Sequence, residues 1–220
     1  MNVLVACEES QEVCKAFRAR GHRAFSCDLQ ECSGGHPEWH IQGDVLPLLN
    51  GNCTFQTADT HTHTQDGRWD LIIAHPPCTY LSNAGACRLY PKKGELSKDR
   101  YINGLKGKEF FMMFWWYGHF GCGPIVIENP LPSSVFELPK ATNVIQPYEF
   151  GEPYSKRTYL WEFGVPTLMP TEICEEYKPY LPSETSRYAG TGKNKGSASG
   201  SRNRSKTFPG IAKAMAEQWG

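Results

Sequence analysis

The sequence predicts an α/β protein with a doubly wound, mostly parallel sheet and helices on both faces. Three short apolar runs, at 3–6, 70–74 and 125–127, have the character of buried strands. Two segments with helical features, at 11–20 and 105–120, lie between them. Because strands that alternate with helices form parallel sheets, we expect these strands to lie side by side in one sheet.

The first unit of this pattern is a strand, a helix and a second strand. The helix at 11–20 is expected to begin after Ser10, a favoured N-cap residue, and to end at Gly21, which suits the position after a helix. The second strand, at 23–27, ends at Asp28. Together they form one β-α-β unit of a parallel sheet.

Four further segments complete the predicted fold. The helix at 105–120 is rich in aromatic residues and is expected to pack against the sheet. Two antiparallel strands are predicted at 146–150 and 158–161, and a last helix at 211–219.

The rest of the chain is predicted to be irregular. Residues 29–41 are expected to form a loop, and the polar residues 50–67 an exposed insertion. Residues 187–205 are basic and rich in glycine and serine. They fall in a reduced C-terminal lobe, 145–206, of a chain whose length predicts a single domain, 1–220.

Composition limits the functions that are open to this chain. The 23 lysines and arginines balance 23 aspartates and glutamates, so any contact with a polyanion must be local. No apolar stretch approaches the roughly 20 residues of a membrane span, and we expect no membrane partner. Nine cysteines without a secretory signal indicate reduced thiols in the cytoplasm, and no obligate protein partner is predicted.

The most informative motif is His75-Pro76-Pro77-Cys78, which directly follows the apolar run 70–74. Each proline fixes its own φ and restricts the residue before it, so the loop has little conformational freedom. The motif therefore holds a thiol rigidly at the carboxyl edge of the sheet, where open α/β sheets bind their ligands.

A second motif follows the next predicted strand. The run 125–127 ends in Glu128-Asn129-Pro130, so a second strand delivers a carboxylate. A thiol and a carboxylate brought to one edge of a sheet suggest covalent chemistry by Cys78, assisted by a proton donor.

These two motifs resemble signature motifs of the DNA cytosine-C5 methyltransferases. The resemblance implies a Rossmann-like methyltransferase sheet, S-adenosylmethionine as cofactor, and a cytosine flipped out of DNA as substrate. It also implies that Cys78 is the nucleophile and that Glu128 contacts the target base.

Other segments resemble the family's motifs in the same order along the chain. Asp28 resembles the acidic residue that holds the cofactor ribose, and Asp44 the residue that meets the adenine amino group. Pro76 is expected to contact the cofactor as well. Residues 207–212 resemble the start of the family's closing helix, beside the cofactor site.

The first loop departs from the family pattern. It is usually rich in glycine, but the residues 6–11 contain none. The backbone at Ala6 therefore approaches the cofactor less freely, and we expect the side chains of Glu8 or Ser10 to replace backbone contacts.

Residues that bind the base are also implied. Arg157 resembles the last arginine of a motif that supports the catalytic carboxylate, here Glu128, by a bidentate contact. The motif usually has a second arginine, whose place is taken by Ser155. Pro77, Asn129 and Ser155 are expected to contact the substrate.

The substrate itself stays open. The family's target-recognition region is long, whereas the interval before the last helix of this chain is short. Methylation of free deoxycytidine nucleotide or of RNA, or an inactive binding module with the same fold, are the alternatives. Enzymes that methylate amino groups are disfavoured, because they place other residue types where His75 and Cys78 lie.

Each candidate residue also has a structural interpretation. Cys78 is alternatively an unreactive loop thiol, Glu128 a cap or ion-pair partner, Asp28 a strand-end residue, Asp44 a turn residue, and Arg157 a surface cation.

A zinc site is a further alternative. Cys27, Cys32, His36 and His40 lie in one stretch with ligand types that zinc prefers, although the two cysteines are further apart than in a usual zinc knuckle. We expect no metal among the site residues, and whether these four residues bind zinc stays open.

Overall fold

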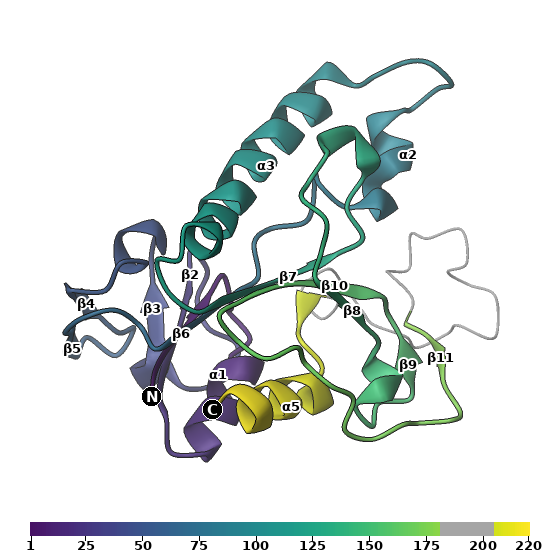
Figure 1. Ribbon diagram of the computed structural model, residues 1–220. Coiled ribbons are helices and arrows are strands. Elements are labelled where there is room, and N and C mark those ends of the chain that lie inside the picture. The colour runs from purple at the N-terminus through teal and green to yellow at the C-terminus, as the bar shows by residue number, and fades with distance from the viewer. Residues whose placement is uncertain (181–204) are drawn as a thin grey trace.

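The computed structural model describes residues 1–180 and 205–220, and these form an α/β protein around a seven-stranded, mostly parallel sheet (Figure 1). The strands of this sheet are β1 (Asn2–Ala6), β2 (Arg23–Asp28), β3 (His40–Gln42), β6 (Leu71–Ala74), β7 (Ile125–Pro130), β8 (Asn143–Ile145) and β10 (Thr158–Phe163). Their order across the sheet is β3-β2-β1-β6-β7-β10-β8.

The first five strands in this order are parallel to their neighbours. β10 runs antiparallel to both of its neighbours, β7 and β8. The strands predicted at 3–6, 23–27, 70–74, 125–127 and 158–161 are thus confirmed as members of one sheet.

One face of the sheet is covered by α3 (Lys98–His119), which lies above the sheet in Figure 1. Phe111 and Phe114 of this helix are fully buried and form one hydrophobic cluster with Leu4 and Ile72 of the sheet. The expected packing of the aromatic helix against the sheet is therefore confirmed.

The other face is covered by α1 (Glu12–Ala19) and α5 (Pro209–Trp219), which lie side by side in Figure 1. Phe17 and Met215 from these helices are fully buried in a second cluster with Val3 of β1. Because successive strand residues point to opposite faces, the same strands serve both hydrophobic layers.

Smaller elements lie around the sheet. A hairpin of β4 (Cys53–Gln56) and β5 (Thr62–Gln65) forms one two-stranded sheet, and β9 (Tyr154–Ser155) with β11 (Lys178–Pro179) forms another. The short helix α2 (Ala86–Leu89) precedes α3. Single 3-10 turns are formed by Pro37–Trp39, Leu46–Leu48, Asn83–Gly85, Ser134–Phe136 and Pro147–Glu149.

Two segments predicted to be irregular contain strands. The polar segment 50–67 holds the β4–β5 hairpin, because Phe55 and Gln65 are buried on one side of strands that are otherwise polar. The loop predicted at 29–41 contains the 3-10 turn Pro37–Trp39 and the start of β3. The prediction of irregular structure was therefore wrong at the β4–β5 hairpin and at 40–41, because hydrophobic periodicity is weak in such short strands.

The strand predicted at 146–150 is also wrong. Pro147 lacks an N–H for a strand ladder, and residues 147–149 form a 3-10 turn. A capping box stabilises this turn, in which the Glu149 carboxylate accepts a hydrogen bond from the Gln146 N–H at 2.6 Å. The strand that pairs with β10 is β8, just before this turn.

The ends of three elements differ from the prediction. The N-cap of α1 is Gln11 in a left-handed conformation, in place of Ser10. α3 begins at Lys98, seven residues before 105. β7 continues to Pro130 because β10 pairs with its last residues, so Glu128 and Asn129 belong to the strand. The basic residues predicted at 187–205 lie outside the described residues, apart from Ser205.

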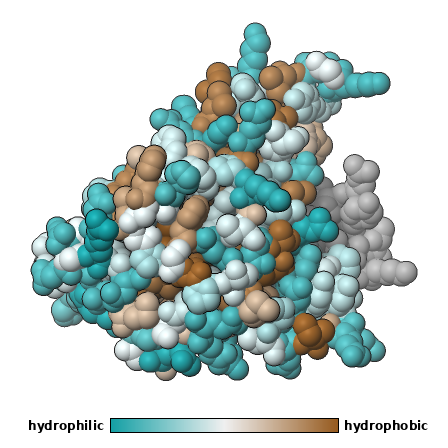
Figure 2. All heavy atoms as spheres, viewed as in Figure 1, coloured by the Kyte–Doolittle hydropathy of each residue, from teal (hydrophilic) through white to brown (hydrophobic). Residues whose placement is uncertain are grey.

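Within the two described ranges, no helix is both long and apolar enough to cross a lipid bilayer. Some apolar side chains of α3, such as those of Met113 and Trp116, are exposed. Figure 2 shows hydrophobic and hydrophilic residues interspersed over the face in view.

The start of α5 approaches the backbone that follows β8. A Cβ atom built on Gly210 would lie 1.9 Å from the carbonyl oxygen of Phe150, and the Gly210 N–H donates to a carboxylate oxygen of Glu152 at 3.0 Å. Only glycine fits this contact, which fixes where α5 begins.

We therefore expect Gly210→Ala to lower the free energy of unfolding by about 1–3 kcal/mol, because the methyl group forces the backbone apart. Urea unfolding measures this change. Gly43→Ala is the matched control, since nothing lies within 4 Å of a Cβ built there. An equal loss of stability in both variants would contradict the close contact at Gly210.

Candidate functional site

The candidate site lies where the strand order reverses. β1 leads to β2 on one side, and the chain then crosses to β6 on the other side of β1. The loops that follow β1 and β6 therefore lead to helices on opposite faces of the sheet. Open α/β sheets bind their ligands beside such a reversal, at the carboxyl ends of the strands.

The centre of the site is a buried pair of His75 and Glu128. β6 and β7 are parallel, with Ala74 beside Ile127, so the next residue on each strand comes to the same place. The His75 Nδ1 and Glu128 Oε2 atoms are 2.8 Å apart, and only 11% and 12% of the two side chains are exposed. The two strands thus deliver a shared proton to the sheet edge.

The electrostatics of the pair favour a charged imidazole and a carboxylate. Burial alone lowers the pKa of His75, but the hydrogen bond and charge of Glu128, with the charge of Glu8, raise that pKa above its ordinary 6.5. Burial raises the pKa of Glu128, but the hydrogen bond and charge of His75 bring it below its ordinary 4.5.

Two more groups act on the Glu128 carboxylate. The Thr207 hydroxyl, from the segment just before α5, donates to Oε2 at 3.4 Å. The positive charge of Lys156, which precedes β10, further lowers the pKa of Glu128. Groups from three other parts of the chain therefore act on one carboxylate.

Glu8 has a different role from the one expected. Its two carboxylate oxygens accept hydrogen bonds from the Val13 and Cys14 N–H groups, at 2.7 and 3.2 Å, at the first turn of α1. Burial raises the pKa of Glu8, whereas His75 and these two N–H groups oppose the rise. The carboxylate that was expected to face the cofactor is therefore bound to the helix, and Ser10 and Ala6 are buried.

The loop that carries Cys78 is tied to the end of β7. The Asn129 side-chain amide donates to the Pro76 carbonyl at 2.8 Å, and Asn129 is buried. The Cys78 carbonyl accepts hydrogen bonds from the Leu81 and Ser82 N–H groups, so the chain turns directly after the motif. Cys78 is partly buried, Pro76 buried and Pro77 exposed. Both motifs found in the sequence thus meet.

Arg157 does not hold Glu128. Among the described residues, the hydrogen-bond partners of the Glu128 carboxylate are His75 and Thr207, and the predicted bidentate contact from Arg157 is not formed. Arg157 is exposed and lies close enough to the Tyr148 hydroxyl to oppose the rise of its pKa. Ser155 is half-buried in β9.

Asp28 and Asp44 lie together at the carboxyl ends of β2 and β3. Burial raises the pKa values of the Cys7 and Cys27 thiols, and the charges of both aspartates raise them further. Each aspartate uses Oδ1 to cap its own turn, by accepting from Gln30 N–H at 2.9 Å and Leu46 N–H at 3.0 Å. Two carboxylates at one edge suit the hydroxyl and amino groups of a nucleoside.

Three of the four residues considered for zinc have other contacts. His40 is buried and bonded to Ser26 and Gln30, while the Cys27 thiol faces the Gly43 carbonyl. His36 stacks on Trp39, with ring centroids 3.8 Å apart. Within the described ranges, no group of three or more histidine, cysteine, aspartate or glutamate side chains is placed to hold a metal ion.

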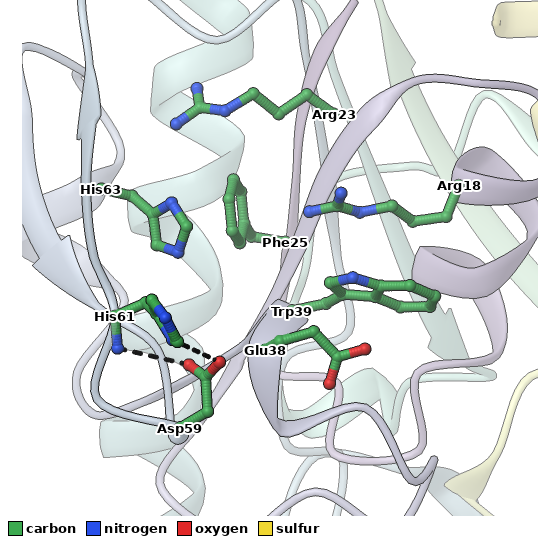
Figure 3. A pocket seen from close by; sticks show the side chains of 8 residues that line it. All are labelled: Arg18, Arg23, Phe25, Glu38, Trp39, Asp59, His61 and His63. Carbon is green, nitrogen blue, oxygen red and sulfur yellow. Dashed lines mark hydrogen bonds and ion pairs between the residues drawn. The ribbon is translucent and has the colours of Figure 1, made fainter.

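A separate cavity of about 400 Å³ lies at the open edge of β2 (Figure 3). Arg18 lies over Phe25 and Trp39 and donates to the Ala24 carbonyl at 2.7 Å. The Arg18 side chain thus contacts the first half of β2, with which β3 does not pair. This cavity contains none of the predicted site residues; it is lined by Arg18, Arg23, Phe25, Glu38, Trp39, Asp59, His61 and His63.

Three residues of the site were missed as functional candidates: His75, Lys156 and Thr207. A signal for His75 was available, since a polar residue directly after one parallel strand meets its counterpart after the neighbouring strand. Lys156 and Thr207 had no comparable signal, because their approach to Glu128 depends on how β10 and α5 are packed.

The buried pair makes stability depend on pH. The contribution of His75 is fully present below its ordinary pKa of 6.5 and is lost as pH rises through the raised value. The contribution of Glu128 is present above its ordinary pKa of 4.5 and is lost as pH falls through the lowered value. The pair therefore stabilises the fold most between these two ordinary values.

We expect His75→Gln to lower the free energy of unfolding by about 1.5–3 kcal/mol near pH 5.5, and by less near pH 8.5, because a hydrogen bond to a charged group is lost. Urea unfolding of both proteins at the two pH values measures the difference. A loss of stability that is the same at both would contradict a charged pair.

No protein-family model matches this chain, and no curated protein matches it in sequence. Its motifs and the geometry of its site are therefore the grounds on which a function can be proposed.

Proposed function

We propose that this protein is an S-adenosylmethionine-dependent methyltransferase that modifies cytosine C5 in DNA through a covalent adduct with Cys78. One observation carries the proposal: the loop of Pro76, Pro77 and Cys78 is hydrogen-bonded to the Glu128-Asn129 end of β7. A thiol and a carboxylate are thus held near one edge of the sheet, which supports the resemblance to cytosine-C5 methyltransferases.

The strand order supports the proposal. The parallel strands β3-β2-β1-β6-β7 follow one another as in a doubly wound, Rossmann-like nucleotide-binding sheet, with the reversal next to β1. In such a sheet the nucleoside part of a cofactor lies over the carboxyl ends of the first strands. Asp28 and Asp44 are at these ends.

Asp28 and Asp44 are the residues proposed to hold S-adenosylmethionine, through the ribose hydroxyls and the adenine amino group respectively. When bound, this cofactor supplies the electrophilic methyl group that an activated C5 accepts. The fit rests on the two carboxylates, which share one edge and whose charges raise the pKa values of the same two thiols, Cys7 and Cys27.

Cys78 is the proposed nucleophile. Cytosine C5 is too weak a nucleophile to be methylated unaided, and addition of a thiolate at C6 converts the ring into an enamine. Thiolate, rather than thiol, is the reactive form of cysteine. The two prolines before Cys78 and the turn after it restrict where its sulfur lies.

Glu128 is the proposed acid. As the thiolate adds at C6, negative charge develops on the ring and reaches N3, where a positioned proton donor lowers the barrier. After methylation, loss of the C5 proton to a base and elimination of the thiolate restore the aromatic ring. A cytosine in duplex DNA must leave the base stack to meet these groups.

We expect Cys78→Ser to abolish methyl transfer, because a serine hydroxyl at neutral pH is a far weaker nucleophile than a thiolate. Transfer of tritiated methyl groups to DNA, RNA and deoxycytidine monophosphate, measured side by side, tests both the nucleophile and the substrate. Cys87→Ser, which changes an exposed cysteine nine residues away, is the matched control and should keep full activity.

The wild-type protein should also form a denaturant-stable adduct with DNA that contains 5-fluorocytosine, because fluorine at C5 prevents the final elimination. Full activity of Cys78→Ser would overturn the covalent mechanism. Adduct formation with the mononucleotide or RNA, but not with DNA, would replace DNA as the substrate.

The cofactor assignment predicts that Asp28→Asn weakens binding of S-adenosylmethionine by about 10-fold or more, since a charge-assisted hydrogen bond becomes a neutral one. Isothermal titration calorimetry measures the affinity. Asp66→Asn, which changes an exposed aspartate directly after β5, is the control and should bind S-adenosylmethionine with unchanged affinity. Absence of any binding to the wild-type protein would reject the family assignment.

A further inference from the structure

We propose that His75 is a positioning residue that supplies the proton which Glu128 delivers to cytosine N3, so that the acid of this site is a histidine–glutamate pair. The inference rests on the proposed function and extends it to a residue for which the resemblance implies no role. It follows from the geometry of the pair, the charges that face it and the chemistry of the addition step.

The geometry fixes one ring nitrogen of His75 on the carboxylate. The Nδ1 to Oε2 distance of 2.8 Å is that of a charge-assisted hydrogen bond. The other ring nitrogen, Nε2, is buried and has no hydrogen-bond partner among the described residues. An unpaired buried nitrogen is costly, so this atom marks where a bound molecule or a water completes the site.

The charges around His75 come from three segments. Glu8 approaches from the loop before α1, Glu128 from β7, and Lys156 from the segment before β10. Two carboxylates favour the imidazolium form, and one ammonium group opposes it. Because Glu8 is itself bound to the first turn of α1, its position relative to His75 is set by the helix.

The addition step needs the proton that this pair holds. When the Cys78 sulfur forms its bond to C6, the C5–C6 π electrons move toward C4 and the C4–N3 π electrons move onto N3. The Glu128 carboxylate first takes the Nδ1 proton of His75 and then gives a proton to N3. The thiolate and the imidazolium both become neutral, and elimination reverses the same electron and proton movements.

A histidine can supply a proton to the carboxylate, whereas an arginine cannot. An arginine beside the carboxylate orients it but never gives up a proton, because its pKa exceeds about 12. A histidine changes its charge near neutral pH. Replacing an arginine support by His75 therefore makes the proton supply of the site, and so its rate, depend on the histidine's protonation.

The test uses release of tritium from C5 of cytosine in DNA, without cofactor. After the thiolate adds at C6, the enamine takes up a proton from water at C5 and loses the tritium from the same carbon before the thiolate is eliminated. We expect His75→Gln to lower the exchange rate about 100-fold near pH 7.5, the size typical of a lost general acid. Its residual rate should rise as pH falls, since Glu128 must then itself carry the proton. His61→Gln, which breaks an exposed histidine–aspartate pair, should match the wild type.

A second measurement on the cofactor-free protein does not depend on activity. Nitrogen-15 NMR should show the His75 ring still charged above pH 6.5 in the wild type, and a lower pKa in Glu128→Gln, because the raised pKa depends on Glu128.

The two readouts separate the possible failures. An unchanged exchange rate, or a rate lowered equally at every pH, in His75→Gln would overturn the role of His75 while leaving the methyltransferase proposal intact. A normal NMR titration of the pair without exchange from any cytosine substrate would instead reject the proposed function. A wild-type His75 ring that is neutral at pH 6.5 would overturn the inference whatever the exchange rates are.

Discussion

The site depends on the parallel register of β6 and β7. These strands carry the two polar motifs of the chain at the same end, with Ala74 beside Ile127. One residue further on, this register brings His75 to Glu128, and then Pro76 to Asn129, through bonds of 2.8 Å each. A shift of one residue would send these side chains to opposite faces of the sheet and separate them.

The same register explains how a charged pair is tolerated in the interior. Burying an ion pair costs several kcal/mol per charge in desolvation, which good geometry and further hydrogen bonds must offset. Here the Thr207 hydroxyl donates to Glu128, and the Glu8 carboxylate adds favourable charge on the histidine side. Thr207 lies just before α5 and Glu8 just before α1, so the packing of these two helices against the sheet holds both groups beside the pair.

An element of the fold or a contact of the site could be predicted when the residues that indicate it are close together in the sequence. Apolar runs and Gly21 mark their elements by themselves, and the central strands and α1 were predicted near their observed bounds. The β4–β5 hairpin was missed because its threonines form a strand only once Phe55 meets the core. The meeting of the two motifs was expected, but the histidine in it was not, although its place directly after β6, beside the end of β7, was a signal for it.

The error at Arg157 shows why a motif does not fix a side chain's contact. Lys156 and Arg157 are adjacent, yet the charge of the first acts on Glu128 and the charge of the second acts on Tyr148. A lysine is a point charge without the planar fork of an arginine, so it lowers the pKa of the carboxylate without orienting it. Orientation is then left to His75 and Thr207. Without an arginine contact, Glu128 needs another group to fix it, and of its two hydrogen-bond partners among the described residues the histidine is the one that can also exchange a proton with it near neutral pH.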